Sequence, residues 1–312
     1  MIISASRRTD IPAFYAEWLL QRLREGVVLV RNPMNFHQVS RLILSPQDVE
    51  CLVFWTKNAA PMLEKLKEIT ALGYPYYFLF TLTPYDSSIE VKVPAVADRI
   101  KTFQALALQI GKERVLWRYD PILFTSRYSL HFHIEAFTAL AADLAGYTET
   151  CIVSFVEMYR KCRKNLGNLE LTSPSLAARI ECLSRLRDIA AATGINLRTC
   201  AAGEELQATG MAAGKCIDDG LISKIGGRPI IARKDANQRA ACRCVESIDI
   251  GAYDSCPHGC RYCYANNDLQ TAMRNSAAHS PASPLLHGTL GNEDRITDRP
   301  LKSLRVKQQQ LF

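Results

Sequence analysis

Three cysteines lie close together near the C-terminal end of the chain, in the segment DSCPHGCRYCYAN. Cys256, Cys260 and Cys263 have the spacing C-x3-C-x2-C, which fits poorly with the paired C-x2-C knuckles of a zinc ribbon. Three thiolates on one short loop can instead bind three irons of a [4Fe–4S] cluster, and the fourth iron then stays open to a small chelating ligand. The loop therefore predicts an iron–sulfur site with an open coordination position.

Four further cysteines could form a second metal centre. Cys242 and Cys244 lie in ACRCVES, Cys216 lies in GKCIDDG, and Cys200 ends a strand candidate. A C-x-C pair is tight for one tetrahedral zinc but acceptable on an iron–sulfur cluster. We expect these four thiols to close an auxiliary cluster, with the alternative that some are small buried hydrophobic residues. The cysteines expected in the core are Cys51, Cys151, Cys162 and Cys182.

The composition is that of a soluble globular protein. The 312 residues are 48% hydrophobic and 22% charged, enough for one large barrel or two smaller domains. The N-terminus lacks the features of a signal peptide, and no apolar run approaches the roughly 18 residues of a membrane span. We therefore expect a cytoplasmic protein with reduced cysteines and no membrane association. The dispersed net charge of +7 is compatible with an anionic partner but more simply indicates a weakly basic surface.

Short apolar runs alternate with helix-length segments along most of the chain, a pattern typical of a parallel sheet covered by helices. We predict an α/β fold with a (β/α) barrel, complete or partial, over residues 1–267. The segment VRNPMNFHQVSRLIL fits a hairpin better than a barrel unit, so six to eight barrel strands are expected. The strand candidates are 1–6, 27–31, 51–56, 76–83, 114–119, 151–158, 195–200 and 247–253. The helix candidates are about 11–24, 59–72, 94–111, 133–145 and 174–193.

Residues 268–312 differ from the rest of the chain. They are rich in Ser, Pro, Gly and Asn and lack an apolar period, which predicts a flexible tail. The last residues, VKQQQLF, resemble the short peptide by which bacterial replication and repair proteins bind the DNA sliding clamp. In this resemblance Leu311 and Phe312 would fill an apolar groove and Gln308 would fix the orientation. The alternative is that the terminal Leu-Phe pair folds back onto the barrel.

Polar side chains follow most of the strand candidates, where a (β/α) barrel carries its chemistry. We expect them to line one pocket, with simple exposure to water as the alternative. The set is Arg7, Arg8, Asp10, Thr56, Lys57, Asn58, Thr81, Thr83, Tyr85, Arg118, Tyr119, Asp120, Ser154, Glu157, Tyr159 and Cys200. From it, the candidate catalytic residues are Tyr119, Asp120 and Glu157. The histidines expected at the surface are His131, His133 and His258.

The cysteine loop resembles a known enzyme signature. CPHGCRYC matches the C-x3-C-x-aromatic-C pattern of the radical S-adenosylmethionine (SAM) enzymes, with Tyr262 in the aromatic position, and CYAN is similar to the spore photoproduct lyase branch. The whole chain more closely resembles a bacterial family of unknown function whose C-terminal cysteine cluster is similar to the radical SAM one. That resemblance rests on SASRRTDIP, VFWTKN, RYDP, KCIDDGLI and CVESIDIGAYDSCPHGCRYCYAN.

The resemblance implies an enzyme. Cys256, Cys260 and Cys263 would ligate a [4Fe–4S] cluster whose open iron takes the amino and carboxylate groups of SAM, and Tyr262 would lie against the adenine. One electron would cleave SAM to methionine and a 5′-deoxyadenosyl radical, which takes a hydrogen atom from an unknown substrate. A reducing partner such as flavodoxin or ferredoxin is implied. The CYAN resemblance, the clamp-like peptide and the positive charge together make a DNA lesion a candidate substrate.

The position of the cysteine loop departs from the usual radical SAM order. In most of those enzymes the loop follows the first barrel strand, whereas here it follows the last strand candidate, SIDIGAY. A circular permutation explains this if 247–253 fills the first slot in space and 1–6 the next. SRRTD would then lie where the family holds the SAM amino group. Asp10 is a candidate acceptor for the ammonium and Arg7 or Arg8 for the carboxylate, with a structural role for the arginines as the alternative.

Two other functions fit parts of the sequence. In a metal-binding, nucleic-acid-associated protein, the cysteines would hold zinc or a structural iron–sulfur cluster without SAM chemistry. In a simple electron carrier, the cluster would need no open iron. The repeated buried strands favour a catalytic scaffold over a small recognition module. Three cysteines beside a polar pocket argue against a simple electron carrier.

Overall fold

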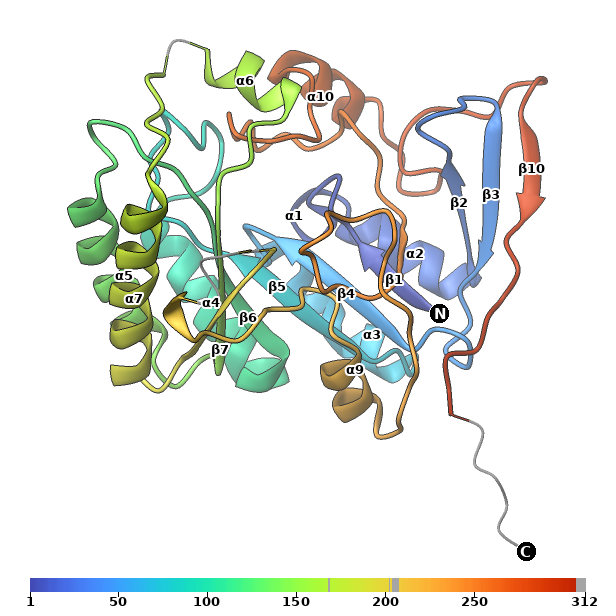
Figure 1. Cartoon of the computed structure of the whole chain (residues 1–312). Coiled ribbons are helices and arrows are strands. Elements are labelled where there is room, and N and C mark those ends of the chain that lie inside the picture. The colour runs from blue at the N-terminus through green and yellow to red at the C-terminus, as the bar shows by residue number, and fades with distance from the viewer. Residues whose placement is uncertain (168, 202, 204–207, 307–312) are drawn as a thin grey trace, which may run out of the picture.

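A parallel sheet of seven strands forms the centre of the computed structural model (Figure 1), which describes residues 1–167, 169–201, 203 and 208–306. The strand order is β8-β7-β6-β5-β4-β1-β9, and each neighbouring pair is parallel. Parallel neighbours need crossover connections, which helices supply here. The strands are β1 (Ile2–Ala5), β4 (Cys51–Thr56), β5 (Tyr76–Thr81), β6 (Val115–Ile122), β7 (Thr150–Phe155), β8 (Asn196–Thr199) and β9 (Ile248–Asp249).

Helices cover one face of this sheet, which we call the outer face. Their apolar side chains and those of the strands form the larger core, and Trp117 of β6 stacks on Phe137 with ring centroids 4.7 Å apart. Ser129 and Ser175 cap the N-termini of the two helices that follow them. The helices of the described residues, of which α9 packs on the opposite face, are α1 (Ile11–Phe14), α2 (Ala16–Glu25), η1 (Ala60–Lys65), α3 (Leu66–Ala71), α4 (Val96–Ile110), η2 (Lys112–Arg114), α5 (Leu130–Leu144), α6 (Arg160–Leu166), α7 (Leu176–Ala192), α9 (Asp219–Gly226) and α10 (Leu269–Ala277).

The inner face of the sheet carries a second, smaller apolar cluster. Side chains alternate along a strand, so Trp117 and Tyr119 of β6 lie in the outer core while Leu116 lies in the inner cluster. The inner cluster also contains Cys216, Ile222 of α9 and other buried side chains as far as residue 245. A single segment, residues 216–245, therefore packs on the inner face.

The predicted barrel is confirmed only as a parallel α/β sheet. Within the described part of the chain, no strand pairing joins β8 to β9, so closure is not observed. The apolar contacts of residues 216–245 occupy the inner face that a closed barrel would turn inward. All of the predicted strand regions contain strands, and the first predicted helix is divided at Tyr15 into α1 and α2.

A smaller sheet lies beside the main one and includes one segment of the predicted tail. The predicted hairpin is present as β2 (Val27–Arg31) and β3 (Gln38–Ile43), which pair antiparallel. β10 (Arg295–Asp298) adds to β3 in parallel. Residues 269–298 thus include α10 and β10, where a flexible tail was expected.

Ion pairs hold residues 294–298 against the β2–β3 hairpin. A search of the sequence for periodic apolar residues does not detect such contacts. Arg31 forms an ion pair of 2.6 Å with Asp294, and Arg41 one of 2.5 Å with Asp298. All residues of β10 are exposed.

The clamp-like peptide with Gln308, Leu311 and Phe312 lies outside the described residues. Among the helices that are described, none is long and apolar enough to cross a membrane.

Candidate functional site

The loop that carries Cys256, Cys260 and Cys263, here called the triad, is closed by its own backbone. The amide of Asp254 donates to the carbonyl of Ala265 at 3.1 Å, and the amide of Cys263 donates to the carbonyl of Cys260 at 3.0 Å. The side-chain amide of Asn266 donates to the carbonyl of Cys256 at 2.7 Å. These bonds fix the two ends of the loop against each other and hold the three thiols on one turn.

A glycine allows the turn between the first two triad cysteines. Gly259 has a φ of +68°, a left-handed conformation that costs little only for glycine. A Cβ at this position would lie 3.0 Å from the side chain of Leu269 and 3.3 Å from that of Val91. The loop also pairs with the segment after β5, since Arg261 donates its amide to Ile89 and Lys92 donates its amide to His258, each at 2.9 Å. The turn is therefore tightly packed on two sides.

The triad thiols are half-buried and lie close to positive charge. Burial raises the pKa of each thiol, and the nearby Lys57 opposes that rise at Cys260 and Cys263. Lys161 adds a further positive charge near Cys263. Metal binding requires thiolates, so lysines beside half-exposed thiols fit an anionic metal centre.

The described residues contain no group of three or more His, Cys, Asp or Glu side chains arranged to hold a single metal ion. A cubane cluster does not require such a group, because each cysteine binds a different iron.

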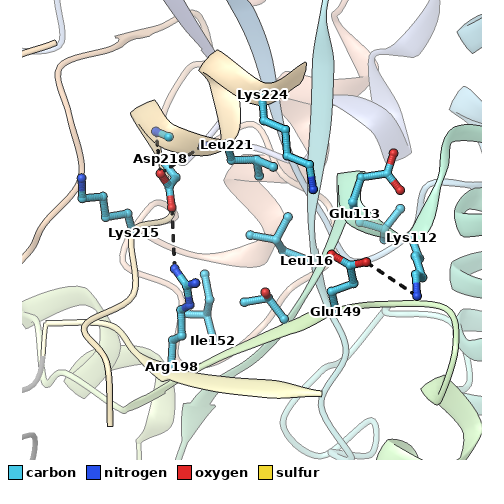
Figure 2. A pocket seen from close by; sticks show the side chains of 13 residues that line it. Lys112, Glu113, Leu116, Glu149, Ile152, Arg198, Lys215, Asp218, Leu221 and Lys224 are labelled. Atoms are coloured by element: carbon cyan, nitrogen blue, oxygen red, sulfur yellow. Dashed lines mark hydrogen bonds and ion pairs between the residues drawn. The ribbon is translucent and has the colours of Figure 1, made fainter. Parts of the chain in front are cut away.

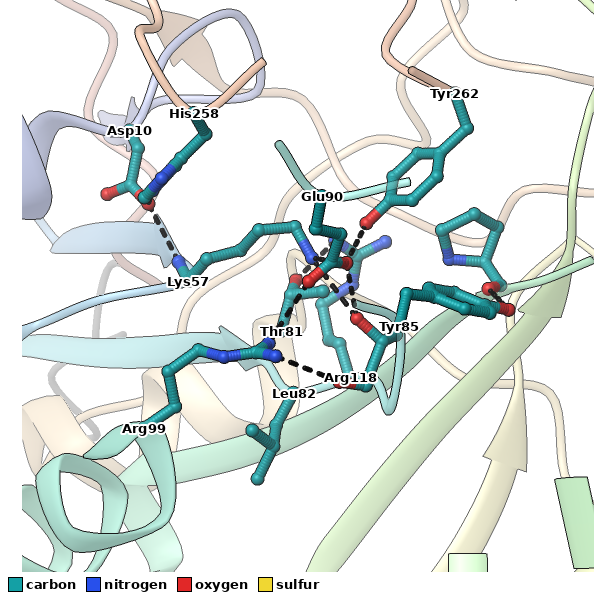
Figure 3. A network of polar contacts seen from close by, with 12 residues as sticks. Asp10, Lys57, Thr81, Leu82, Tyr85, Glu90, Arg99, Arg118, His258 and Tyr262 are labelled. Carbon is teal, nitrogen blue, oxygen red and sulfur yellow. Dashed lines mark hydrogen bonds and ion pairs between the residues drawn. The ribbon is translucent and has the colours of Figure 1, made fainter. Parts of the chain in front are cut away.

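A buried carboxylate links the triad loop to the strand ends (Figure 3). Glu90 accepts from Lys57 at 2.7 Å and from the Thr83 hydroxyl at 2.5 Å, and the Tyr262 hydroxyl also donates to it. Arg99 lies 3.3 Å away. Burial alone would raise the pKa of Glu90, but Lys57 and Arg99 outweigh it and lower the pKa. Sequence reasoning missed Glu90 because it lies in a loop after β5, beyond the strand end.

Asp10 and His258 form a second buried pair beside the triad. His258 is 3% exposed, and its Nε2 lies 2.8 Å from Asp10 Oδ2. Asp10 also caps α1 through the amide of Ala13 at 3.0 Å and accepts from the amide of Lys57 at 2.7 Å. The expected surface position of His258 is wrong, because its loop folds against α1. These three partners hold Asp10 in place, and its contact with the ammonium of SAM stays a prediction.

The arginines after β1 are held by β9. Asp249 accepts from the Ser6 hydroxyl at 2.6 Å and from the amide of Arg7 at 2.7 Å. The guanidinium of Arg8 lies 5.1 Å from the ring centroid of Tyr253, a cation–π contact. A Cβ on Gly251 would collide with Ser6, so glycine permits this close approach. These contacts fix the arginines beside β9, and their contact with the carboxylate of SAM stays a prediction.

Four other cysteines, here called the quartet, meet on the inner face of the sheet: Cys200, Cys216, Cys242 and Cys244. The sulfur atoms of Cys200 and Cys216 are 4.0 Å apart. Hydrogen bonds from the Cys216 and Cys242 thiols lower the pKa of both Cys200 and Cys244. Correspondingly, the pKa values of Cys216 and Cys242 are raised. The prediction that these four residues come together is consistent with this geometry.

Comparison with known families gives one match over most of the chain. Residues 2–265 match the family described as Domain of unknown function (DUF1848). The chain belongs to this family. The matched span includes the triad and the quartet, together with the strands that carry them. No curated protein matches the chain.

The three candidate catalytic residues of this DUF1848 protein lie in different places. Tyr119 faces the outer core, where its hydroxyl lies 2.8 Å from Nδ1 of His133. Its assignment to the pocket is therefore wrong, because Tyr119 and Asp120 are neighbours on one strand and point to opposite faces. Asp120 pairs with Arg118 and accepts from Ser154 at 2.5 Å.

Glu157 lies at an exposed position near the quartet. Its carboxylate is 3.1 Å from Arg239, and its side chain is 56% exposed. Among the histidines predicted at the surface, His131 is exposed and pairs with Glu135 at 3.2 Å, as expected. His133 is fully buried, and burial lowers its pKa to about 4, which corrects its predicted position.

The cysteines predicted for the core are buried free thiols: Cys51, Cys151, Cys162 and Cys182. Cys162 also contacts the triad loop, since its sulfur lies 2.9 Å from the carbonyl of Tyr262. The Tyr262 ring packs edge-on against Tyr85, with centroids 6.1 Å apart, and Lys57 Nζ lies 5.5 Å from the ring centroid. The aromatic residue of the loop thus belongs to the same network as Glu90.

A pocket of about 390 Å³ lies at the starts of β6 and β7, away from the triad (Figure 2). Its charges are largely paired, with Lys112 and Glu149 3.6 Å apart and Arg198 and Asp218 3.9 Å apart. A smaller cavity of about 380 Å³ borders Cys260 and Asn266. Of these two cavities, the one that borders Cys260 lies beside the triad.

Proposed function

We propose that this protein is a radical SAM-type iron–sulfur enzyme. The observation that carries the proposal is the triad loop, which places three half-buried thiols on one rigid turn beside two lysines. The position of β9 supports it further, because β9 pairs with β1 at the edge of the sheet. The strand before the loop thus fills the first slot, and β1 fills the next, as a permuted radical SAM order requires.

Each residue of the site has a distinct task in this proposal. Cys256, Cys260 and Cys263 hold a [4Fe–4S] cluster, which, when bound with SAM, supplies one-electron reductive cleavage and a 5′-deoxyadenosyl radical. Lys57 offsets part of the negative charge of the thiolates. Glu90 orients Lys57 and Tyr262 through its hydrogen bonds to both.

Radical chemistry also requires that water and competing groups are kept away. Tyr85, Ile89 and Leu123 form a buried apolar cluster that packs against Tyr262. A contact between Tyr262 and the adenine of SAM stays part of the proposal. The electron donor, a flavodoxin or ferredoxin, and a DNA lesion as substrate stay predictions from the sequence.

The proposal is tested by reductive cleavage of SAM. The protein is reconstituted anaerobically with iron and sulfide, and 5′-deoxyadenosine is measured after addition of dithionite. Cys256→Ala, Cys260→Ala and Cys263→Ala should each lower its formation at least 100-fold, whereas Cys182→Ala, a buried cysteine of α7, should retain most of it. Formation of 5′-deoxyadenosine by any folded triad variant at the rate of the unmodified protein would overturn the proposal, as would none from the unmodified protein.

A further inference from the structure

We propose that the quartet is a structural zinc site, in which four cysteines surround one ion. This site is separate from the triad, and it does not rest on the proposed function. Its ligands would be Cys200, Cys216, Cys242 and Cys244 on the inner face of the sheet. A zinc ion with four protein ligands has no open position for a substrate, so the task of the site would be to hold the chain in its fold.

The spacing of two quartet sulfurs fits a single ion. The sulfur atoms of Cys200 and Cys216 lie 4.0 Å apart. Four sulfurs that each lie about 2.3 Å from one zinc ion are about 3.8 Å from one another in a tetrahedron. Cysteines on a four-iron cubane bind different irons, so their sulfurs lie further apart. The observed distance therefore favours one ion over the auxiliary cluster expected from the sequence.

The four thiols form a ring of sulfur contacts. Hydrogen bonds join Cys200 to Cys216 and to Cys242. Cys244 likewise forms hydrogen bonds with Cys216 and Cys242. Each thiol thus has two sulfur neighbours, and these contacts correspond to four of the six edges of a tetrahedron. The side chains of the quartet are therefore directed toward one common space.

Backbone contacts fix the segments that carry Cys216 and Cys244 beside each other. The amide of Val245 donates to the carbonyl of Ile217 at 3.2 Å. In return, the amide of Ile217 donates to the sulfur of Cys244 at 3.5 Å. An amide that donates to a ligating atom orients that ligand and supports its anionic form. The fold thus supplies a donor to this thiol in the absence of an ion.

Cys242 and Cys244 are separated by one residue, which is a tight spacing for two ligands of one ion. The local backbone makes the spacing possible. Val245 forms an antiparallel bridge with Lys234, and the amide of Asp235 donates to the carbonyl of Cys244 at 2.9 Å. In such an extended segment, residues two apart point to the same side. Both thiols can therefore bind the same ion.

Two arginines lie beside the quartet, Arg118 near Cys200 and Arg7 near Cys244. Four thiolates around one Zn²⁺ carry two net negative charges, which favours cations nearby. Each guanidinium also pairs with a carboxylate. Nη2 of Arg7 and Nε of Arg118 are nevertheless buried atoms that find no hydrogen-bond partner within the described residues. Thiolate sulfurs would give these donors acceptors.

The position of the site explains why the chain would need an ion there. Residues 227–247, all within the described part of the chain, form neither a helix nor a strand. They pack on the inner face of the sheet together with Cys216, while Cys200 directly follows β8. An ion bound by all four cysteines would fasten this irregular segment to the sheet, and its binding free energy would add to the stability of the fold.

The shell must contract slightly when it binds the ion. As the thiols stand, hydrogen-bonded to one another, no described group of His, Cys, Asp or Glu is arranged to hold an ion. The distance between the sulfurs of Cys200 and Cys216 exceeds the tetrahedral edge by only about 0.2 Å. Binding would release the thiol protons to water, replace the bonds between sulfurs by zinc–sulfur bonds, and draw the four sulfurs together.

The experiment measures zinc in a protein that lacks the triad. The combined variant Cys256→Ala, Cys260→Ala and Cys263→Ala is purified anaerobically from cells supplied with zinc, and its metals are counted by mass spectrometry. It should contain about one zinc ion per chain. Adding Cys242→Ser and Cys244→Ser should lower this zinc at least 10-fold, whereas adding Cys182→Ser, a matched change of a buried cysteine in α7, should not.

A second measurement needs no substitution in the quartet and therefore decides the question if the five-fold variant does not fold. The triad variant is freed of metal with a chelator under reducing conditions, and cobalt(II) is added. Visible absorption bands typical of tetrahedral thiolate coordination should appear, and an equal amount of zinc should remove them. Zinc should also raise the thermal unfolding temperature of this variant.

Three results would overturn the inference. These are a folded triad variant with neither zinc nor the cobalt bands, full retention of zinc by a folded five-fold variant, and an iron–sulfur cluster in the triad variant after reconstitution with iron and sulfide. The proposed function fails separately. If the unmodified protein forms no 5′-deoxyadenosine while the triad variant holds its zinc, only the proposed function is wrong.

Discussion

The triad and the quartet use different supports to bring thiols together. The triad takes its cysteines from one loop, whose turn depends on Gly259 and on bonds within residues 254–266. The quartet takes its cysteines from the end of β8, the segment before α9 and the segment before β9. A local loop can present three ligands and leave one side free. Thiols that come from several directions can enclose a bound group completely.

The charges around the two groups differ as well. Beside the triad, Glu90 is buried to 1% exposure and is paired with Lys57 and Arg99. Beside the quartet, Arg7 and Arg118 keep 14% and 16% of their side chains exposed, and Glu157 lies at the surface with 56% of its side chain exposed. Loss of a carboxylate should therefore have very different consequences at the two groups.

The largest effect is expected from Glu90→Gln. This change leaves the charges of Lys57 and Arg99 without their buried partner, and breaking such a pair costs about 3–5 kcal/mol. Glu157→Gln is the matched control, and its exposed pair with Arg239 should contribute within about 0.5 kcal/mol. Urea unfolding of the metal-free variants measures both. Equal losses would show that the two surroundings do not differ as described.

The dependence of stability on pH should show the same special role of the buried Glu90. Lys57 and Arg99 hold the pKa of Glu90 below its usual value, against the effect of burial. Its contribution to stability is therefore complete above the usual glutamate pKa of about 4.3 and is lost as the pH falls through the lower pKa of the folded state. Glu90→Gln should lack this part of the acid-induced loss. A variant with an unchanged slope below pH 4.3 would contradict the assignment.

A smaller loss of stability is expected when a glycine near each group is replaced by alanine. Gly259→Ala places a side chain at a positive φ, which costs about 1–2 kcal/mol, and adds contacts with Leu269 and Val91. Gly214, between Cys200 and Cys216, would place its Cβ 3.2 Å from the carbonyl of Thr199. It has no left-handed backbone, so Gly214→Ala should lower the unfolding free energy less. Thermal unfolding of the two variants would show the reverse order if this comparison is wrong.

Most of the fold could be predicted because its strands are strongly apolar. Runs such as CLVFWT and YYFLFTLT became β4 and β5 at nearly the predicted bounds. The tail could not be read in the same way. β10 is exposed and is held by Arg31 and Arg41, which lie far away in the sequence. Two other features have no periodic signal in the sequence. These are whether the sheet closes into a barrel and how residues 216–245 pack on its inner face.

The candidate site was predictable where its residues are local. The triad has a spacing motif, and the positions at the strand ends led to Lys57 and Thr83. The prediction for Tyr119 was wrong because it used only the position at a strand end. It ignored that successive side chains of a strand point to opposite faces of the sheet. Glu90 and the buried His258 carry no local signal, since their partners, Lys57 and Asp10, reach them only in the folded chain.

The smallest effect should come from Cys162→Ala, which tests whether the triad is complete without a fourth thiol. The sulfur of Cys162 lies 2.9 Å from the carbonyl of Tyr262, a weak contact whose loss should cost about 1 kcal/mol. We expect the iron content to stay unchanged and iron to be lost faster in air, because the loop is less firmly held. Cys182→Ala, a buried control in α7, should not change that rate. If Cys162→Ala instead removed the iron of the triad, Cys162 would be a fourth ligand, and the triad loop would not leave an open position.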